Sequence, residues 1–433
     1  MVVYWTPMKK YKIVTLGCRT NQYESQALSD QLKKEGYVEA QEGEKADLCI
    51  VNTCTVTESA DKRSLYQIRK LARDFSPEKL VVTGCLAERE EKKLLALPRV
   101  TEVIPNHKKE TLLSEVYPEK KWPEFKIERF EAHTRAFVKI QDGCNSYCSY
   151  CVIPFVRGRS RSKKAPEILR EIEGLVANGF KEVVLTGINI GDFDGDETPR
   201  VPLSALIRQV DKIPGLERIR VSSIDPDEVD DDLLDAIING EKTAPSMHIV
   251  LQSGSNLTLK RMRRKYTKQD FIDATKKLVK ANPIFTFTTD IIVGFPGETE
   301  EEFQETLQLM NEVHFAKVHM FPYSDRPKTR ASRMPNKVSQ EIIQERKALL
   351  LEKGERNAYN LRNKFIGSEL TVLLETEEKP GMIMGHSENF LPVQLPKEDL
   401  RQNTLVKVKC VENTPEGLIG ENQADRKIQT LFA

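Results

Sequence analysis

The first hundred residues alternate between short apolar runs and longer amphipathic stretches. Three apolar runs predict β-strands, and the stretches at 21–36 and 58–72 have the apolar spacing of helices. Strands that alternate with helices are typical of a parallel sheet with helices on its faces. The predicted strands are 12–17, 46–53 and 80–84.

A second alternation begins near residue 136. Its six predicted strands, with five helices between them, are too few for an eight-stranded barrel and predict an open, partial barrel. The site of such a barrel is expected at the carboxyl ends of its strands. The strands are 136–140, 182–186, 218–222, 248–252, 285–293 and 316–321, and the helices are 165–179, 202–212, 228–238, 268–281 and 299–313.

Short segments with β character follow residue 364 and predict a small β-barrel. The chain is therefore expected to have an α/β fold in three parts. These are an N-terminal parallel α/β sheet domain (9–118), a central partial (β/α)6 barrel (135–362) and a C-terminal β-barrel (363–433), with a linker at 119–134. The residues before Met8 receive no assignment.

Composition predicts a soluble protein. It has 433 residues, 39% of them hydrophobic and 30% charged, and no apolar run of eighteen residues. The N-terminus lacks the charged-then-apolar order of a secretory signal. A cytoplasmic location without membrane contact is expected, where cysteines remain reduced and available to metal.

The most informative segment holds Cys144, Cys148 and Cys151. A four-iron cluster held only by protein usually takes four thiolates, so three without a fourth nearby leave one iron open, and S-adenosylmethionine is the expected occupant. Disulfides would require a short, cysteine-dense chain, whereas eight cysteines are spread over 433 residues here. Structural zinc would need a fourth ligand, and the nearest upstream histidine, His133, lies eleven residues before Cys144.

Three further cysteines follow the three strands of the first alternation. Cys18, Cys54 and Cys85 each lie where a strand ends. Parallel strands point one way, so these side chains are expected to converge on one edge of the sheet and hold a second cluster. Free cysteine is also a common small core residue, which is the alternative for any one of them.

Net charge is only +1, but its distribution is uneven. Residues 153–166 carry five Arg and Lys residues and no acid, directly after Cys151, and residues 260–268 are similarly basic. A solvated face is the usual explanation for one such run. Two runs in one enzyme favour a polyanionic substrate.

The cysteine loop resembles that of the radical S-adenosylmethionine superfamily, and Cys18, Cys54 and Cys85 add the pattern of its methylthiotransferases. The resemblance covers nearly the whole chain. It continues through the segments 154–161, 185–189, 251–255, 294–299 and 321–324.

The resemblance implies a division of labour. The cluster at Cys144 would bind S-adenosylmethionine and deliver one electron, releasing methionine and a deoxyadenosyl radical. The cluster at Cys18 would carry the sulfur, which a second S-adenosylmethionine methylates. Two [4Fe-4S] clusters, an electron donor protein of the flavodoxin or ferredoxin type, and a sulfur donor are implied.

Other site residues are assigned by position. Tyr150 is expected to pack on the adenine of the cofactor. The remaining cofactor contacts are expected at the ends of later strands, namely Thr186, Gly187, Asn189, Ser222, Gln252 and Asp290. The C-terminal segment resembles the TRAM domain, which is associated with RNA binding, and Phe390 is expected to stack on an anticodon-loop base. The predicted RNA-binding residues are Arg157, Arg159, Arg161, Arg263, Arg264 and Phe390.

Three branches of the family differ in substrate. One modifies isopentenyl adenosine in tRNA, one modifies N6-threonylcarbamoyladenosine in tRNA, and one modifies an aspartate of a ribosomal protein. The segments 18–24, 52–57 and 260–267 look most like the threonylcarbamoyl branch, whose product carries a methylthio group at C2 beside the anticodon. Arginines near the site suit a base with a carboxylate. An iron–sulfur RNA-binding sensor without enzymatic activity is the alternative of another class.

Overall fold

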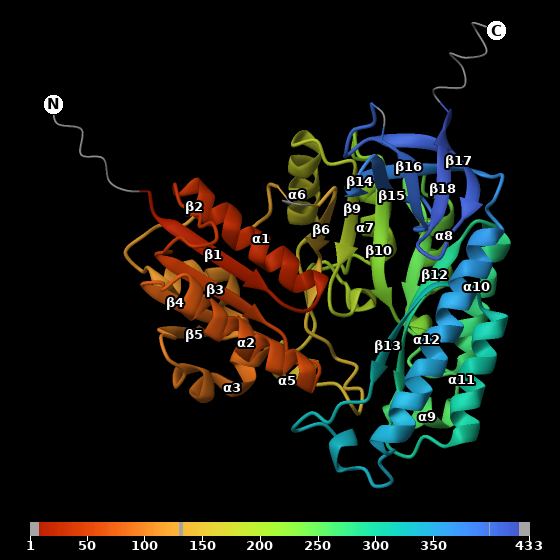
Figure 1. Cartoon of the computed structure of the whole chain (residues 1–433), viewed down its shortest axis with the longest axis horizontal. Coiled ribbons are helices and arrows are strands. Elements are labelled where there is room, and N and C mark those ends of the chain that lie inside the picture. Colours follow the sequence, from red (N-terminus) through yellow and green to blue (C-terminus); the bar gives the residue numbers. More distant parts are fainter. Residues whose placement is uncertain (1–7, 130–132, 398, 424–433) are drawn as a thin grey trace, which may run out of the picture.

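The computed structural model describes residues 8–129, 133–397 and 399–423. Within them, the chain forms a five-stranded sheet, a six-stranded sheet, a closed five-stranded barrel and a separate two-stranded ribbon. Figure 1 shows the three units in red to orange, yellow to cyan, and blue. The α/β fold class is confirmed. The segment before Met8 and parts of the predicted linker (130–132) and of the predicted third domain (398, 424–433) lie outside the described residues.

The first sheet is parallel throughout, with the order β2-β1-β3-β4-β5. Every residue of β3 is buried because helices cover both faces of the sheet. The three predicted strands are present, and two short edge strands add to them. The strands are β1 (Lys10–Thr15), β2 (Val38–Glu39), β3 (Leu48–Thr53), β4 (Lys79–Gly84) and β5 (Glu102–Ile104), and the helices are α1 (Arg19–Lys34), α2 (Glu58–Asp74), α3 (Cys85–Leu95) and α4 (Leu112–Val116).

The second sheet is also parallel, and its order β13-β12-β11-β10-β9-β6 leaves it open between the outer strands. This is the predicted partial barrel, although β11 begins five residues before the predicted strand. Its strands are β6 (Arg135–Lys139), β9 (Glu182–Thr186), β10 (Arg218–Ile224), β11 (Thr243–Ile249), β12 (Thr286–Val293) and β13 (Phe315–Pro322).

Helices of the central unit follow its strands and cover the outside of the sheet (Figure 1). The final helix, α12, has 24 residues and packs along β13. No helix in the described part of the chain is both long and apolar enough to cross a membrane. The helices are α5 (Ile153–Val156), α6 (Ala165–Ala177), α7 (Leu203–Val210), α8 (Asp231–Ile238), α9 (Asn256–Met262), α10 (Lys268–Ala281), α11 (Glu300–Glu312) and α12 (Gln340–Asn363), and the ribbon is β7 (Gln141–Asp142) with β8 (Arg161–Ser162).

Helix α1 joins the first two units. It packs on β1 and β3 and also on β6. Tyr23 and Ala27 of this helix belong to the same core cluster as Ala136 and Val138 of β6. The carboxyl ends of β1, β3 and β4 are thereby held beside the central sheet.

The C-terminal barrel contacts the central sheet near the amino ends of its strands. Arg220 donates to the carbonyl oxygens of Ser387 (2.8 Å) and Glu388 (3.0 Å), and Arg218 donates to that of Thr371 (2.9 Å). The opposite, carboxyl ends stay open to the site. The barrel strands are β14 (Glu369–Lys379), β15 (Met382–Ser387), β16 (Pro392–Pro396), β17 (Leu405–Asn413) and β18 (Leu418–Asn422).

Candidate functional site

The loop with Cys144, Cys148 and Cys151 follows β6 and β7 at the carboxyl end of the central sheet. Gly143 makes its tight start possible. Its φ of +71° disfavours other residues, and a Cβ there would lie 2.1 Å from the carbonyl oxygen of Arg159. Inside the loop, the Cys151 amide donates to the carbonyl of Cys148 (3.0 Å).

Helix α9 holds the other side of this loop. The Ser149 amide donates to the carbonyl of Met262 (2.9 Å), and its hydroxyl donates to that of Arg261 (2.8 Å). Arg264 Nη1 donates to Cys148 Sγ at 2.9 Å, and its other nitrogen binds Asp225. A guanidinium at a cysteine sulfur stabilises the thiolate, which is the form that binds iron.

The other three cysteines lie at the ends of three adjacent strands. Cys18 precedes α1, Cys54 follows β3, and Cys85 begins α3 directly after β4. Gly17, with φ +95°, brings the backbone close, since a Cβ there would lie 2.8 Å from Cys54 Cβ. Burial raises the pKa of Cys54 to about 11, and the neighbouring Cys85 and Cys18 add to the rise.

One small apolar cluster connects the two cysteine loops. Cys85 packs with Val152 and Val156, which lie in and just before α5, directly after Cys151. Asn106 Nδ2 also donates to the carbonyl of Val156 at 2.6 Å. The loops that carry the two cysteine sets are therefore in contact where the two sheets meet.

The thiols of each set are neighbours but are not arranged around a common centre. Among the described residues, no three His, Cys, Asp or Glu side chains form a group that could hold a metal ion. Burial raises the pKa of Cys151 to about 12, and Cys148 and Cys144 add to the rise. Three soft thiol donors per set suit iron–sulfur ligation, in which the metal displaces the protons. The other two cysteines, Cys49 and Cys410, are fully buried in apolar cores.

A cavity of about 260 Å³ opens beside Cys151. Tyr150, Gln252 and Asp290 line it, together with Val56 and Thr57 from the first unit. Gln252 adopts φ +62°, and its buried Oε1 lacks a hydrogen-bond partner among the described residues. An unpaired buried acceptor is costly, so it indicates a ligand that donates a hydrogen bond, as the amino group of S-adenosylmethionine does.

Comparison with known proteins bears on what this arrangement does. Residues 10–105 match the family described as uncharacterized protein family UPF0004, and residues 138–310 match the Radical SAM superfamily. The protein named threonylcarbamoyladenosine tRNA methylthiotransferase MtaB from Chlamydia pneumoniae is 47% identical over 416 residues, which cover 95% of this chain and 97% of that protein. The chain belongs to the radical SAM methylthiotransferase family. S-adenosylmethionine and [4Fe-4S] clusters are the cofactors of this methylthiotransferase.

Other relatives carry a second name. The tRNA-2-methylthio-N(6)-dimethylallyladenosine synthase of Caldicellulosiruptor saccharolyticus is 37% identical to the methylthiotransferase described here and covers 95% of this chain and 92% of its own. Among solved structures, the radical S-adenosylmethionine methyltransferase TsrM from Kitasatospora setae superposes with a TM-score of 0.53 at 13% identity, over 75% of this chain and 74% of that one. At that identity the likeness shows a shared fold alone.

The other predicted cofactor residues occupy different depths of the methylthiotransferase barrel. Thr186 ends β9, and the turn after it is held by Gln141 Oε1, which accepts from the Asn189 amide at 2.9 Å. The Asn189 side chain donates to Glu228 at 2.8 Å, which uses one of the two donors of its amide nitrogen. Ser222 lies within β10 and accepts a long hydrogen bond (3.5 Å) from Arg19. Tyr150 lines the cavity, with its ring edge-on to Phe295. Their cofactor contacts stay predictions.

The arginines of the basic run after Cys151 differ in how far they are buried. Arg159 is exposed, and Arg161 is half exposed and paired with Asp142 at 2.7 Å. The Arg157 side chain is only 1% exposed and binds Glu24 (3.0 Å) and Asp142 (2.8 Å). The structure therefore argues against the predicted RNA contact of Arg157, because two carboxylates already neutralise it inside the protein.

The second basic run is divided in the same way. Arg263 is exposed and ends α9 with φ +60°, whereas the Arg264 side chain is 6% exposed and holds Cys148 and Asp225. A direct RNA contact of Arg264 is thus disfavoured, and a role at the cluster loop replaces it. Phe390 lies between Arg135 and Arg220, about 5 Å from each guanidinium. It faces the inside of the central barrel, and its predicted base contact stays a prediction.

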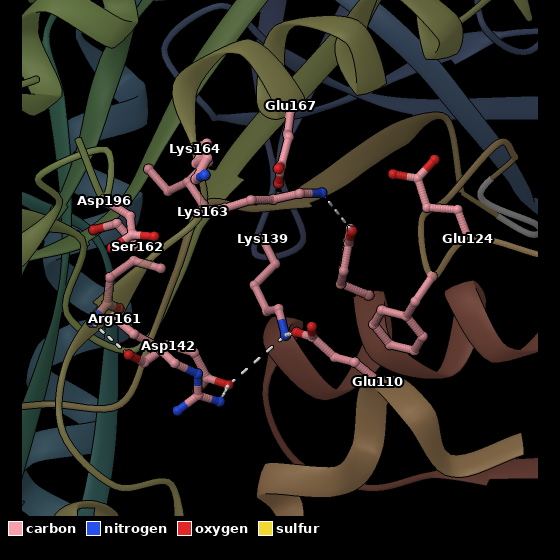
Figure 2. Close-up of a pocket in the computed structure, with 14 residues that line it drawn as sticks. Glu110, Glu124, Lys139, Asp142, Arg161, Ser162, Lys163, Lys164, Glu167 and Asp196 are labelled. Atoms are coloured by element: carbon pink, nitrogen blue, oxygen red, sulfur yellow. Dashed lines mark hydrogen bonds and ion pairs between the residues drawn. The ribbon is translucent and has the colours of Figure 1, made fainter. Parts of the chain in front are cut away.

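Charged side chains fill the contact between the first unit and the cluster loop. A cavity of about 420 Å³ lies there, and Lys139 pairs in it with Glu110 (3.0 Å) and Asp142 (3.8 Å). Figure 2 shows the Lys139 side chain between these two carboxylates. Deeper in, Glu24 of α1 binds the buried Lys109 at 2.6 Å.

Sequence reasoning missed Glu24, since nothing local marks a helical glutamate as buried. It also missed a readable signal, the glycine directly before Cys18, Cys85 and Cys144.

Proposed function

We propose that this protein inserts a methylthio group at C2 of N6-threonylcarbamoyladenosine beside the anticodon of tRNA. The observation that carries the proposal is the contact of Cys85 with Val152 and Val156, which brings two three-cysteine sets together. One set alone accounts for S-adenosylmethionine cleavage. A second set facing the same space accounts for transfer of sulfur to the same substrate.

The chain's own residues have separable roles in this proposal. Cys144, Cys148 and Cys151 hold one cluster, and Cys18, Cys54 and Cys85 hold the other. Arg264 stabilises the Cys148 thiolate through its 2.9 Å hydrogen bond, and Gln252 accepts from the bound S-adenosylmethionine. When bound, the two clusters and S-adenosylmethionine would supply the one-electron chemistry and the sulfur, and the protein would orient them.

The substrate assignment is supported by the relatives and by the surface. The name MtaB recurs among relatives that match nearly the whole chain, at 47% and 36% identity. Arg159 and Arg263 stay exposed in the two basic runs and are free to meet phosphates. The C-terminal barrel, assigned to 363–433, would bind RNA. A cytoplasmic location, a flavodoxin- or ferredoxin-type electron donor and a separate sulfur donor belong to the same proposal.

The test is anaerobic reconstitution of the protein with iron and sulfide, followed by incubation with dithionite, S-adenosylmethionine and unfractionated tRNA. Mass spectrometry of the digested nucleosides is expected to detect the methylthio derivative of threonylcarbamoyladenosine. A methylthio product only on dimethylallyladenosine would instead assign the function named for the Caldicellulosiruptor relative. Modification of a ribosomal protein and not of tRNA would assign the third branch, and RNA binding without cofactor cleavage would assign a sensor.

A further inference from the structure

A second, smaller cavity lies deeper in the central barrel. It measures about 60 Å³ and is lined by inward-facing residues of β6, β9, β10, β11 and β12. Thr288 lines this cavity, and Asp290, two residues further along β12, lines the cavity beside Cys151. His248 Nε2 lies 3.4 Å from the Asp290 carboxylate. The two cavities are therefore neighbours along one strand.

The charge of the small cavity is one-sided. Arg19, Arg135 and Arg220 line it, and none of its described lining residues is acidic. Two of these guanidinium groups form ion pairs with carboxylates that do not line the cavity. Arg220 Nε lies 2.5 Å from Glu182, and Arg135 Nε lies 3.3 Å from Glu375.

Arg19 differs from the other two. It has no ion-pair partner within 4.0 Å among the described residues, and its side chain remains accessible. Its contacts are the Ser222 hydroxyl at 3.5 Å and the face of Phe137, 5.5 Å from the guanidinium carbon. Most of its five donors are thus unused, and a planar guanidinium is suited to bind a carboxylate through two parallel hydrogen bonds.

We propose that this cavity binds the carboxylate of the modified base, with Arg19 as the residue that selects it. The inference rests on the proposed function, since the threonyl part of threonylcarbamoyladenosine carries a carboxylate. By volume the cavity holds about two water molecules, which suits a small polar group and not a base. A dimethylallyl group would leave Arg19 without a partner in the same place, so the cavity discriminates against it.

The position of Arg19 also relates the anion to the reaction. Arg19 directly follows Cys18, one of the three residues assigned to the sulfur-carrying cluster. In adenine, C2 and C6 both flank N1, so the reacting carbon and the N6 substituent share one side of the ring. A substituent held at Arg19 therefore keeps C2 on the anchored edge of the ring, near the residue that follows Cys18.

The experiment compares two anticodon stem-loop RNAs with the reconstituted enzyme, one with the free threonylcarbamoyl acid and one with its methyl ester. Equilibrium binding is measured by fluorescence anisotropy, and methylthiolation is measured as kcat and KM. The unmutated enzyme is expected to prefer the acid by about 10- to 100-fold, mainly in Kd and KM, which is the range of a charge-assisted hydrogen-bond pair.

Variants then assign the preference to one residue. R19M is expected to bind acid and ester equally within about twofold, and R19K is expected to recover part of the preference because it restores charge without the planar fork. Arg356→Met is the control, since Arg356 lies exposed on α12 and forms an exposed pair with Glu352. Iron content is measured for each variant because Arg19 adjoins Cys18.

Each result separates the two proposals. If the unmutated enzyme methylthiolates neither RNA and no tRNA, the proposed function fails. If it uses acid and ester equally well, the function stands and the carboxylate site is overturned. Retention of the full preference by R19M overturns the role of Arg19, and the ester comparison needs no variant to fold.

Discussion

Glu24 is the carboxylate on which the contact between the first unit and the cluster loop depends most. Its side chain is 3% exposed and lies 3.0 Å from Arg157, 2.6 Å from Lys109 and 3.4 Å from Lys139. These cations are themselves at most 8% exposed. Replacing Glu24 by Gln leaves Arg157 and Lys139 with Asp142 as their remaining buried carboxylate partner, and it leaves Lys109 with no carboxylate partner among the described residues.

Removing one partner of a buried ion pair costs about 3–5 kcal/mol, because the other charge stays buried and uncompensated. We expect a loss of this size for E24Q in the first urea transition of the cluster-free protein, measured by circular dichroism. Glu128→Gln is the matched control. Its pair with Lys34 at 2.5 Å is about 40% exposed on both sides and is worth about 1 kcal/mol or less.

The pH dependence provides a second test. Burial alone would raise the pKa of Glu24, but Arg157, Lys109 and Lys139 hold that pKa well below its usual 4.5. A carboxylate with a lowered folded pKa stabilises the fold above its unfolded pKa, and this contribution is lost as pH falls further. The stability difference between wild type and E24Q is therefore expected to be full at pH 7 and to shrink below about pH 4.5. A difference under 1 kcal/mol at pH 7, equal to that of E128Q, would refute the reasoning.

Three further predictions concern the cysteine sets. Cys54→Ala is expected to lower the iron content by about half and to abolish methylthiolation, while deoxyadenosine still forms. Cys49→Ala, in the core of the same sheet, is the control and is expected to keep the iron of both cysteine sets. Full iron content and intact sulfur insertion in C54A would contradict the second cluster. Arg264→Met removes a cation and a hydrogen bond from Cys148, so the reduction potential of that cluster is expected to fall in an EPR-monitored titration, and an unchanged potential would show that the contact has no electronic role. Gly17→Ala adds a Cβ 2.8 Å from Cys54 Cβ at φ +95° and is expected to reduce iron only at the set of Cys18, Cys54 and Cys85, measured as iron per chain. Gly36→Ala is the control, because Gly36 has φ +80° and open space around it and so shares the backbone strain without the clash. Equal iron loss in both variants would argue against the close approach.

Much of the architecture could be read from local patterns. The strands at 46–53 and 80–84 appear as β3 and β4, because runs of three or four consecutive apolar residues favour a strand buried on both faces. Strand β11 was harder to place. Its residues 243–248 mix polar and apolar types, because one face of that strand lines a polar cavity, so the prediction began at His248 instead.

The charged runs show the limit of local reading. Arg157, Arg159 and Arg161 alternate along one basic segment, yet only Arg157 is buried. Its partner Glu24 lies 133 residues earlier, on helix α1 of the first unit. Local composition does not encode which charge faces a distant carboxylate, so the sequence alone assigned all three to RNA.

The sequence by itself determined the two three-cysteine sets and the parallel order of the strands before them, since both follow from spacing and periodicity within a few tens of residues. Only the tertiary structure decided what surrounds those sets. It brought α1 against β6, buried Glu24 among three cations and directed Arg19 into the central barrel, with Ser222 203 positions further along the chain. Such contacts depend on how the sheets pack, because desolvation and long-range charge pairing exist only once the core has formed.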